Sequence, residues 1–170
     1  MQRILIIGNA GSGKTTFAKQ LAKKLGLPLL HLDMIFWCGN WKHISQEEFD
    51  TLLQAELEKP QWIIDGNFNR TLPHRLQYCD YVFFFDLPAA VCLWGVIRRV
   101  LENYGKTRSD MGGNCPEYFD TEKWELCRHV LAFNKEHRKK YYQLLENAPH
   151  AQVTVFRSRK QVNTFLRNWQ

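Results

Sequence analysis

The segment GNAGSGKTT, residues 8–16, places the strongest constraint on what this chain can fold into. It matches the phosphate-loop pattern G-x-x-x-x-G-K-[ST], and it directly follows the apolar run RILII of residues 3–7. A buried strand, a glycine-rich turn and a helix form the setting of such a loop, because glycine permits backbone angles that let successive N–H groups point at one anion. The sequence therefore predicts a loop that binds a nucleoside triphosphate.

The loop residues have separate expected roles. Lys14 supplies a point charge for the β- and γ-phosphates and is a predicted catalytic residue, and the Thr15 hydroxyl is expected to bind Mg²⁺. The helix that begins at Lys14 adds the partial positive charge of its N-terminus. The predicted ATP-binding residues of the loop are Gly8, Ala10, Gly11, Ser12, Gly13, Lys14, Thr15 and Thr16.

Short apolar runs alternate with helical patterns along the rest of the chain. The expected strands are residues 3–7, 29–32, 62–64, 81–85 and 152–156. The expected helices are residues 14–25, 45–59, 89–103, 121–147 and 158 onward. This alternation predicts a single α/β domain over residues 1–170, with a parallel sheet covered by helices on both faces. Residues 104–119 are rich in Gly, Asp, Asn and Pro, and are predicted to form a mobile loop.

Magnesium also needs a carboxylate at the end of a strand, and the chain offers two. Asp65 ends the run WIID and is followed by Gly66, which lets the chain turn close to the phosphates. Asp86 ends the run VFFFD and is followed by Leu-Pro, as in many structural strand ends. We favour Asp65 as the magnesium carboxylate and keep Asp86 as the alternative.

Composition indicates a soluble cytoplasmic protein. No apolar run approaches the roughly 20 residues of a membrane span, and the N-terminus leads straight into the first strand rather than into a cleavable signal. The five cysteines lack a C-x-x-C pair, which favours reduced thiols. Acidic and basic residues balance over residues 1–97, so the formal net charge of +6 comes from residues 98–170. Two interpretations of this basic half stay open: a surface that attracts nucleic acid or a phosphate-rich small ligand, and solvated helix faces with an excess of Lys and Arg.

The motifs GNAGSGKTT, HLDMIFW, WIIDGNFNR and FFFDLP, in this order and spacing, resemble a family of small adenylate-kinase-related proteins often labelled "DNA topology modulation protein". The resemblance covers nearly the whole chain. It implies a three-layer P-loop fold with a five-stranded parallel sheet in the order 2-3-1-4-5, and a small lid at about residues 104–120. It also implies ATP-dependent phosphotransfer with Mg²⁺.

Several arginines follow residue 97, and they have the composition of a lid that closes over phosphates. Arginine suits this role because its planar fork pairs two phosphate oxygens and keeps its charge. In the resembled kinases, an arginine entering the lid packs on adenine, which by position is Arg98 or Arg99. Others clamp the transferring phosphate, for which Arg108 and Arg138 are the candidates. Arg99, Arg108 and Arg138 are therefore predicted catalytic residues, and Arg98 a predicted ATP-binding residue.

Asp33 is the predicted acceptor residue, because it follows a strand at the edge where open α/β sheets bind ligands. Its carboxylate is expected to hydrogen-bond an acceptor hydroxyl or to act as its base. Arg70 and Arg75 are candidates for holding one acceptor phosphate. The expected acceptor-binding segment, residues 34–60, contains no arginine, so a hydroxyl-bearing acceptor with little or no phosphate stays open beside a nucleotide.

Aromatic side chains and one histidine lie close to Asp33 in the sequence. Phe36, Trp37 and Trp41 form either a hydrophobic cap, which we favour, or a platform for a base. His31 is expected to be a core or edge residue rather than a catalyst.

The favoured function is transfer of the ATP γ-phosphate to a small molecule or nucleotide, by a monomer or homodimer without membrane contact. The alternative is an ATP-binding regulatory or nucleic-acid-associated protein with little kinase activity. No helix-turn-helix or RNA-binding strand motif supports that alternative.

Overall fold

The computed structural model describes residues 2–168, apart from the side chains at positions 134 and 136. The strands are β1 (Arg3–Gly8), β2 (Leu29–His31), β3 (Trp37–Gly39), β4 (Lys42–His43), β5 (Trp62–Asp65), β6 (Tyr81–Phe85) and β7 (Gln152–Phe156). The helices are α1 (Lys14–Leu25), α2 (Leu32–Phe36), α3 (Gln46–Leu57), α4 (Leu72–Leu76), α5 (Ala89–Glu102), α6 (Thr121–Glu136), α7 (Arg138–Glu146) and α8 (Arg159–Asn168). Within the described range, no helix combines the length and apolar character needed to cross a membrane.

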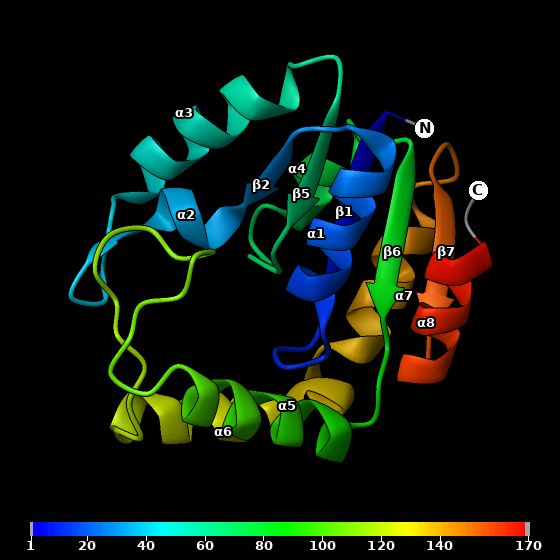
Figure 1. Cartoon of the computed structure of the whole chain (residues 1–170). Helices are drawn as coiled ribbons and strands as arrows, with labels where there is room; N and C mark the ends of the chain where they lie inside the picture. Colours follow the sequence, from blue (N-terminus) through cyan, green and yellow to red (C-terminus); the bar gives the residue numbers. More distant parts are fainter. Residues whose placement is uncertain (1, 169–170) are drawn as a thin grey trace.

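Five parallel strands form the central sheet in the order β2-β5-β1-β6-β7 (Figure 1). Counted within this sheet alone, the order is 2-3-1-4-5, so the predicted topology is confirmed. The central strand β1 pairs with β5 so that Ile6 lies opposite Asp65, and with β6 so that Gly8 lies opposite Phe85. The loop that follows β1 and the carboxylate that ends β5 therefore emerge at the same edge of the sheet.

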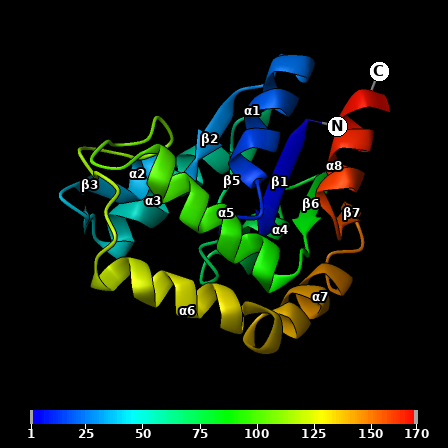
Figure 2. The ribbon, with the colours of Figure 1, turned by 60° about the horizontal axis from the view of Figure 1, so that its bottom comes forward.

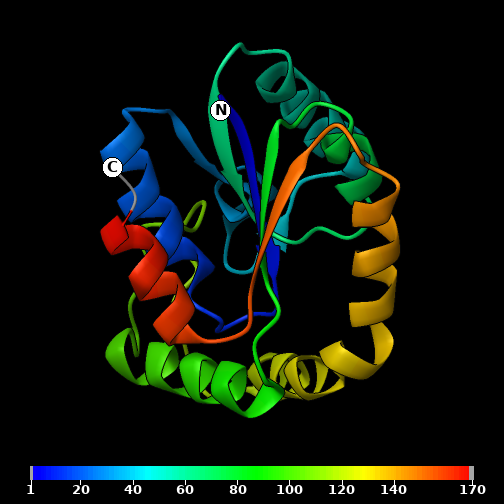
Figure 3. The ribbon, with the colours of Figure 1, turned by 90° about the vertical axis from the view of Figure 1, so that its right-hand side faces the viewer.

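Helices cover both faces of the sheet, as predicted. In Figure 3, α1 and α8 lie on one side of the strands, and α3 and α7 lie on the other. Because side chains alternate along a strand, β1 sends Leu5 and Ile7 into one core and Ile4 and Ile6 into the other. Phe17 of α1 packs edge-on against aromatic rings of β6 and β7 in the second core.

The carboxyl edge of the sheet is crossed by α5 and α6, which pack against each other below it (Figures 1 and 2). The single helix predicted for residues 121–147 is wrong, because the chain bends at His137 between α6 and α7. One straight helix of that length would extend roughly 40 Å. Phe133 and Tyr141 belong to the same core cluster, with ring centroids 5.3 Å apart, so the chain turns to follow that core.

Four short elements were not predicted from the sequence. Helix α2 follows β2 directly and leads into the antiparallel hairpin β3–β4, and α4 follows β5. Each helix or strand among them has five residues or fewer, too short for a periodic apolar pattern to stand out. Residues 104–120, called the lid segment below, form no helix, and two isolated bridges tie their start to their end.

Candidate functional site

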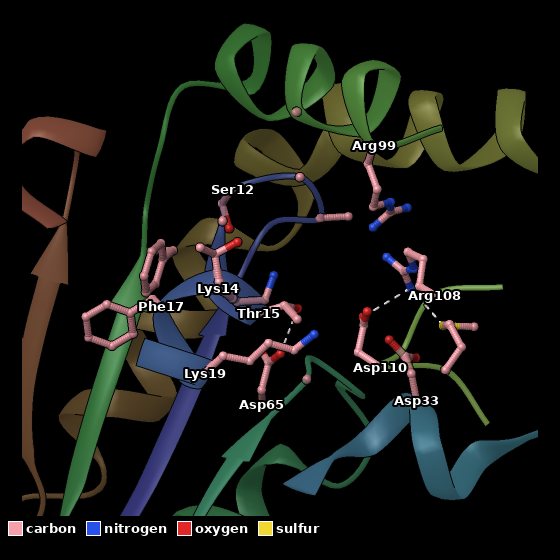
Figure 4. Close-up of a pocket in the computed structure, with 18 of the residues that line it drawn as sticks. Ser12, Lys14, Thr15, Phe17, Lys19, Asp33, Asp65, Arg99, Arg108 and Asp110 are labelled. Carbon is pink, nitrogen blue, oxygen red and sulfur yellow. Dashed lines mark hydrogen bonds and ion pairs between the residues drawn. The ribbon is translucent and has the colours of Figure 1, made fainter. Parts of the chain in front are cut away.

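A cavity of about 870 Å³ lies at the carboxyl edge of the sheet, where open α/β folds bind ligands. It is lined by the loop after β1, by α5, by the lid segment and by residues of α2 and the β3–β4 hairpin. Figure 4 shows Lys14, Thr15 and Asp65 on one side, and Arg99, Arg108, Asp110 and Asp33 on the other. The volume lies in the range of pockets for small molecules and cofactors.

The phosphate loop has the backbone geometry that its sequence predicts. All residues from Ala10 to Thr16 line the cavity, while Gly8 lies at the end of β1 with its N–H bonded to the Asn67 side chain. Gly13 has φ of +100° and precedes α1 without a side-chain cap. The first N–H groups of α1 are therefore open to an anion. Burial lowers the pKa of Lys14, although the nearby Asp65 charge opposes that shift.

The loop is held by a close backbone contact with α5 that the sequence motif does not reveal. A Cβ atom added to Gly95 would lie 2.0 Å from the Gly11 carbonyl oxygen, and one added to Gly11 would lie 2.1 Å from the Cys92 carbonyl oxygen. Real Cβ atoms do not approach backbone so closely, so only glycine fits at either position. Gly95 therefore lets α5 pack directly on the loop.

Thr15 and Asp65 form a site that fits Mg²⁺. The Thr15 hydroxyl donates to Asp65 Oδ2 at 2.8 Å, and the His31 Nδ1 atom lies 3.0 Å from the same oxygen. The other oxygen, Asp65 Oδ1, is buried and has no hydrogen-bond partner within the described residues. A buried carboxylate oxygen without a partner is suited to bind a cation or its water. Asp86 faces elsewhere, because it pairs with Arg138 and accepts from Tyr142.

Arg99 and Arg108 reach the cavity from different segments and meet at one carboxylate. Glu117 of the lid segment is fully buried, and its Oε1 atom lies 3.6 Å from Arg99 Nε and 3.3 Å from Arg108 Nε. Its other oxygen pairs with Lys123 of α6. Burial alone raises the pKa of Glu117, but the charges of Arg99, Lys123 and Arg108 outweigh it, so the pKa is lowered. Glu117 is thus held ionised between three cations.

The lid segment is irregular, as predicted, but it is packed into the protein. Asp110, Met111, Cys115 and Glu117 are buried. The Gly112 N–H donates to the Asp33 carbonyl at 3.1 Å, and a Cβ atom at Gly112 would lie 2.2 Å from the Trp37 carbonyl oxygen. The segment therefore closes one side of the cavity by packing on α2 and on the hairpin.

Asp33 lies in the first turn of α2, beside two tryptophans of the hairpin. The Trp37 indole N–H donates to Asp33 Oδ1 at 3.3 Å. Burial raises the pKa of Asp33, and the negative charge of Asp65 adds to this effect, while the Arg108 charge opposes it. Trp37 and Trp41 line the cavity, whereas Phe36 packs on Phe49 and Phe68.

Three arginines predicted to contact phosphate lie outside the cavity lining. Arg70 is exposed and forms a two-bond ion pair with Asp50. Arg75 is fully buried and donates to the carbonyl oxygens of Gly66, Asn67 and Phe68. Arg138 pairs with Asp86 instead of pointing into the cavity.

Arg98 and His31 were also singled out from the sequence. Arg98 lines the cavity, but it is exposed and paired with Glu102. His31 is buried, as expected.

Sequence reasoning missed much of the cavity wall, including Gly95, Asp110, Glu117 and Lys123. Glycine within a helix lowers helix stability by about 1 kcal/mol relative to alanine. A glycine at position 95 of a predicted helix therefore indicates that another segment packs closely there. The other three carry no local signal, because surface charges of the same types are common along the chain.

Comparison with known proteins agrees with this geometry. Residues 4–65, from β1 to Asp65, match the family described as "ATPase family associated with various cellular activities (AAA)". Shikimate kinase from Bacteroides thetaiotaomicron superposes with a TM-score of 0.59 and 19% identity, covering 99% of this chain and 96% of that one. Shikimate kinase from Acinetobacter baumannii, in complex with shikimate, superposes with a TM-score of 0.59 and 16% identity, covering 98% of this chain and 92% of that one. No curated protein sequence matches the chain significantly.

These findings establish the fold. Residues 4–65 match a family of ATPases, and the chain shares the P-loop kinase fold of the two shikimate kinases at low sequence identity. Their likeness extends over almost the whole length of each chain.

Gly95→Ala tests the contact between α5 and the loop. The new methyl group has no space beside the Gly11 carbonyl, so α5 or the loop must shift. We expect destabilisation of about 1–3 kcal/mol and an ATP affinity lowered about tenfold. Calorimetric titration with Mg·ATP and thermal unfolding measure both. Trp94→Ala, at the exposed neighbouring position, is the control. Wild-type affinity and melting temperature in Gly95→Ala would refute the contact.

Arg75→Met and Arg70→Met form a matched pair for stability. Arg75→Met leaves three carbonyl groups behind β5 without their donor, and we expect a loss of about 3 kcal/mol. Arg70→Met removes an exposed ion pair, so we expect a loss of about 1 kcal/mol or less. Urea unfolding gives both values. Equal losses would contradict the structural role of Arg75.

Proposed function

We propose that this protein is an ATP-dependent phosphotransferase that moves the γ-phosphoryl group to a hydroxyl of a small acceptor. The observation that carries the proposal is the continuity of the cavity. The same cavity that contains the phosphate loop also contains the Asp33 carboxylate, with Arg99 and Arg108 reaching into it. An enzyme that only hydrolyses ATP has no need for a partly buried carboxylate across the cavity from the phosphate loop. The shared fold of the two shikimate kinases supports the same interpretation.

Lys14 and the loop N–H groups are proposed to hold the β- and γ-phosphates. Thr15 and Asp65 are proposed to hold Mg²⁺, which neutralises phosphate charge when bound. Arg99 and Arg108 are proposed to stabilise the charge on the migrating group, because they are preorganised around Glu117 before any substrate arrives. Arg98, which also lines the cavity, is proposed to cover adenine. Arg70, Arg75 and Arg138 have no part in this scheme, since each lies outside the cavity lining and contacts a partner there.

Asp33 is proposed to act on the acceptor. Its carboxylate accepts the proton of the acceptor hydroxyl as that oxygen bonds to the γ-phosphorus, and the bond from this phosphorus to the bridging oxygen breaks to leave ADP. Such proton transfer contributes about 10²–10⁴-fold to a rate. The contact between Trp37 and Asp33 Oδ1 orients the carboxylate for this task.

The family label that refers to DNA topology suggests a different role, in which ATP switches binding to nucleic acid. The excess positive charge of residues 98–170 is the observation in its favour. Two of the cations in that half, Arg99 and Arg108, are committed to the cavity wall. We therefore propose transfer to a small molecule as the main activity. DNA binding through many phosphate contacts would fall steeply with salt, whereas transfer in a closed cavity would not.

ADP release with and without acceptors tests the proposed activity. Purified protein with Mg·ATP is assayed against nucleosides, nucleoside monophosphates and small hydroxylated metabolites. We expect at least one acceptor to raise ADP release far above the rate in water, and Lys14→Ala to abolish the increase. An ADP-release rate that no acceptor changes, in protein that still binds ATP, would exclude the transferase and favour the ATP switch.

Asp33→Asn tests the proposed base. We expect kcat to fall about 100-fold or more while the Kd for ATP changes less than twofold, because the introduced amide cannot take up a proton. Burial raises the pKa of Asp33, so wild-type activity should fall with decreasing pH already above the ordinary carboxyl range. This acid limb of the pH–rate profile should be lost in the variant. Asp50→Asn, at the surface, serves as the control. Undiminished turnover of Asp33→Asn would remove Asp33 from the site.

A further inference from the structure

The end of the cavity farthest from the phosphate loop has its own chemistry. We call it the acceptor end and define it by Asp33, Trp37, Trp41, Arg108 and Asp110, which all line the cavity. These residues come from α2, the hairpin region and the lid segment. Figure 4 shows Asp33 and Asp110 beneath Arg108, on the side opposite the loop. The charges here decide which acceptors can enter.

Arg108 carries the only guanidinium among these five residues, and this guanidinium already faces two carboxylates. Its Nη2 atom lies 3.4 Å from Asp110 Oδ2, and its Nε atom lies 3.3 Å from Glu117 Oε1. Arg99 and Lys123 also face Glu117. Lys19 lines the same cavity and donates to the Ser109 hydroxyl at 2.9 Å.

Within the acceptor end as defined, Arg108 is the single cation, and it lies among the two carboxylates of Asp33 and Asp110. Enzymes bind phosphate and carboxylate groups through several charge-assisted hydrogen bonds, most often from arginine. Here Arg99 and Arg108 are already required by the γ-phosphate in the proposed function. Arg70 and Arg75, the arginines predicted to hold an acceptor phosphate, are bound elsewhere. A second anion at this end would face the carboxylates of the acceptor end at close range, where like charges repel strongly in a partly desolvated site.

The same end suits hydroxyl groups and an apolar ring face. Ionised carboxylates accept hydrogen bonds from hydroxyls, and Asp33 and Asp110 offer two such groups. Trp37 and Trp41 form an aromatic wall, with ring centroids 5.3 Å apart. Trp41 is fixed by its N–H bond to the Pro116 carbonyl and by a lysine ammonium above its ring. A rigid aromatic wall beside carboxylates matches a ring that carries hydroxyls on its edge and C–H groups on its face.

We propose that the acceptor is a ring-shaped, hydroxylated molecule that carries no phosphate or carboxylate group of its own. This inference rests on the proposed phosphotransfer, and it narrows the acceptor to sugars, nucleosides and comparable uncharged rings. It excludes nucleoside monophosphates, the acceptors of adenylate kinases.

Matched pairs of probes test this charge selection. Adenosine and AMP, cytidine and CMP, and glucose and glucuronate keep the same ring within each pair and differ by an anionic group. Binding is followed by tryptophan fluorescence with a non-hydrolysable ATP analogue and Mg²⁺, and transfer by phosphorus NMR of the product. We expect binding of at least one uncharged member, about 100-fold tighter than that of its anionic partner.

Asp110→Asn tests whether the carboxylates of the acceptor end cause this charge selection. The change frees the Arg108 guanidinium from one of its carboxylates. We expect the preference for the uncharged member to shrink about tenfold. Trp37→Ala should weaken binding of the uncharged ring about tenfold. Asp50→Asn removes a carboxylate outside the cavity lining and should leave the ratio unchanged.

The outcomes separate this inference from the proposed function. Tighter binding of the anionic members, or no binding of any ring tested, overturns the inference. Transfer to an anionic member alone overturns it while the phosphotransferase stands. Binding of an uncharged member without any phosphate transfer confirms the charge selection of the acceptor end, but it contradicts the proposed function and therefore overturns the assignment of that ring as the acceptor.

Discussion

The burial of one carboxylate organises the wall of the site. Glu117 has no exposed surface, and the cations around it come from α5, from the lid segment and from α6. Without it, Arg99, Arg108 and Lys123 would repel one another in a partly desolvated space. Breaking a buried ion pair typically costs about 3–5 kcal/mol, so these three segments are effectively tied together. Arg99 and Arg108 are therefore already positioned at the cavity before a substrate binds.

The other half of the site follows from the topology of the sheet. β2, β5 and β1 are neighbours, and each delivers residues of the cavity at its carboxyl end: Asp33, Asp65 and the loop residues. The parallel register brings them to one edge without any long loop. Gly95 then lets α5 lie directly on the phosphate loop, which links the two halves of the site.

Local patterns predicted the regular part of the fold. The five sheet strands and the helices α1, α3, α5 and α8 lie within a few residues of their expected positions. Short apolar runs specify the strands, and amphipathic runs specify the helices. The bend at His137 was not predicted, since it follows the shape of the core rather than a breaker residue. Of the arginines proposed from the sequence to contact phosphate, Arg99 and Arg108 line the cavity. Others found carboxylate or carbonyl partners elsewhere, namely Arg70, Arg75 and Arg138.

The sequence by itself determined the glycine-rich loop and the strand that leads into it, and it favoured Asp65 over Asp86 as the carboxylate that shares a site with Thr15. These depend on glycine positions and on short apolar runs, which act over a few residues. Only the tertiary structure decided which cations face the cavity and which carboxylates neutralise them. A charge selects its partner among groups distant in the sequence, and desolvation in the folded chain sets the strength of the pairing. The charge of the acceptor end is therefore a property of the fold.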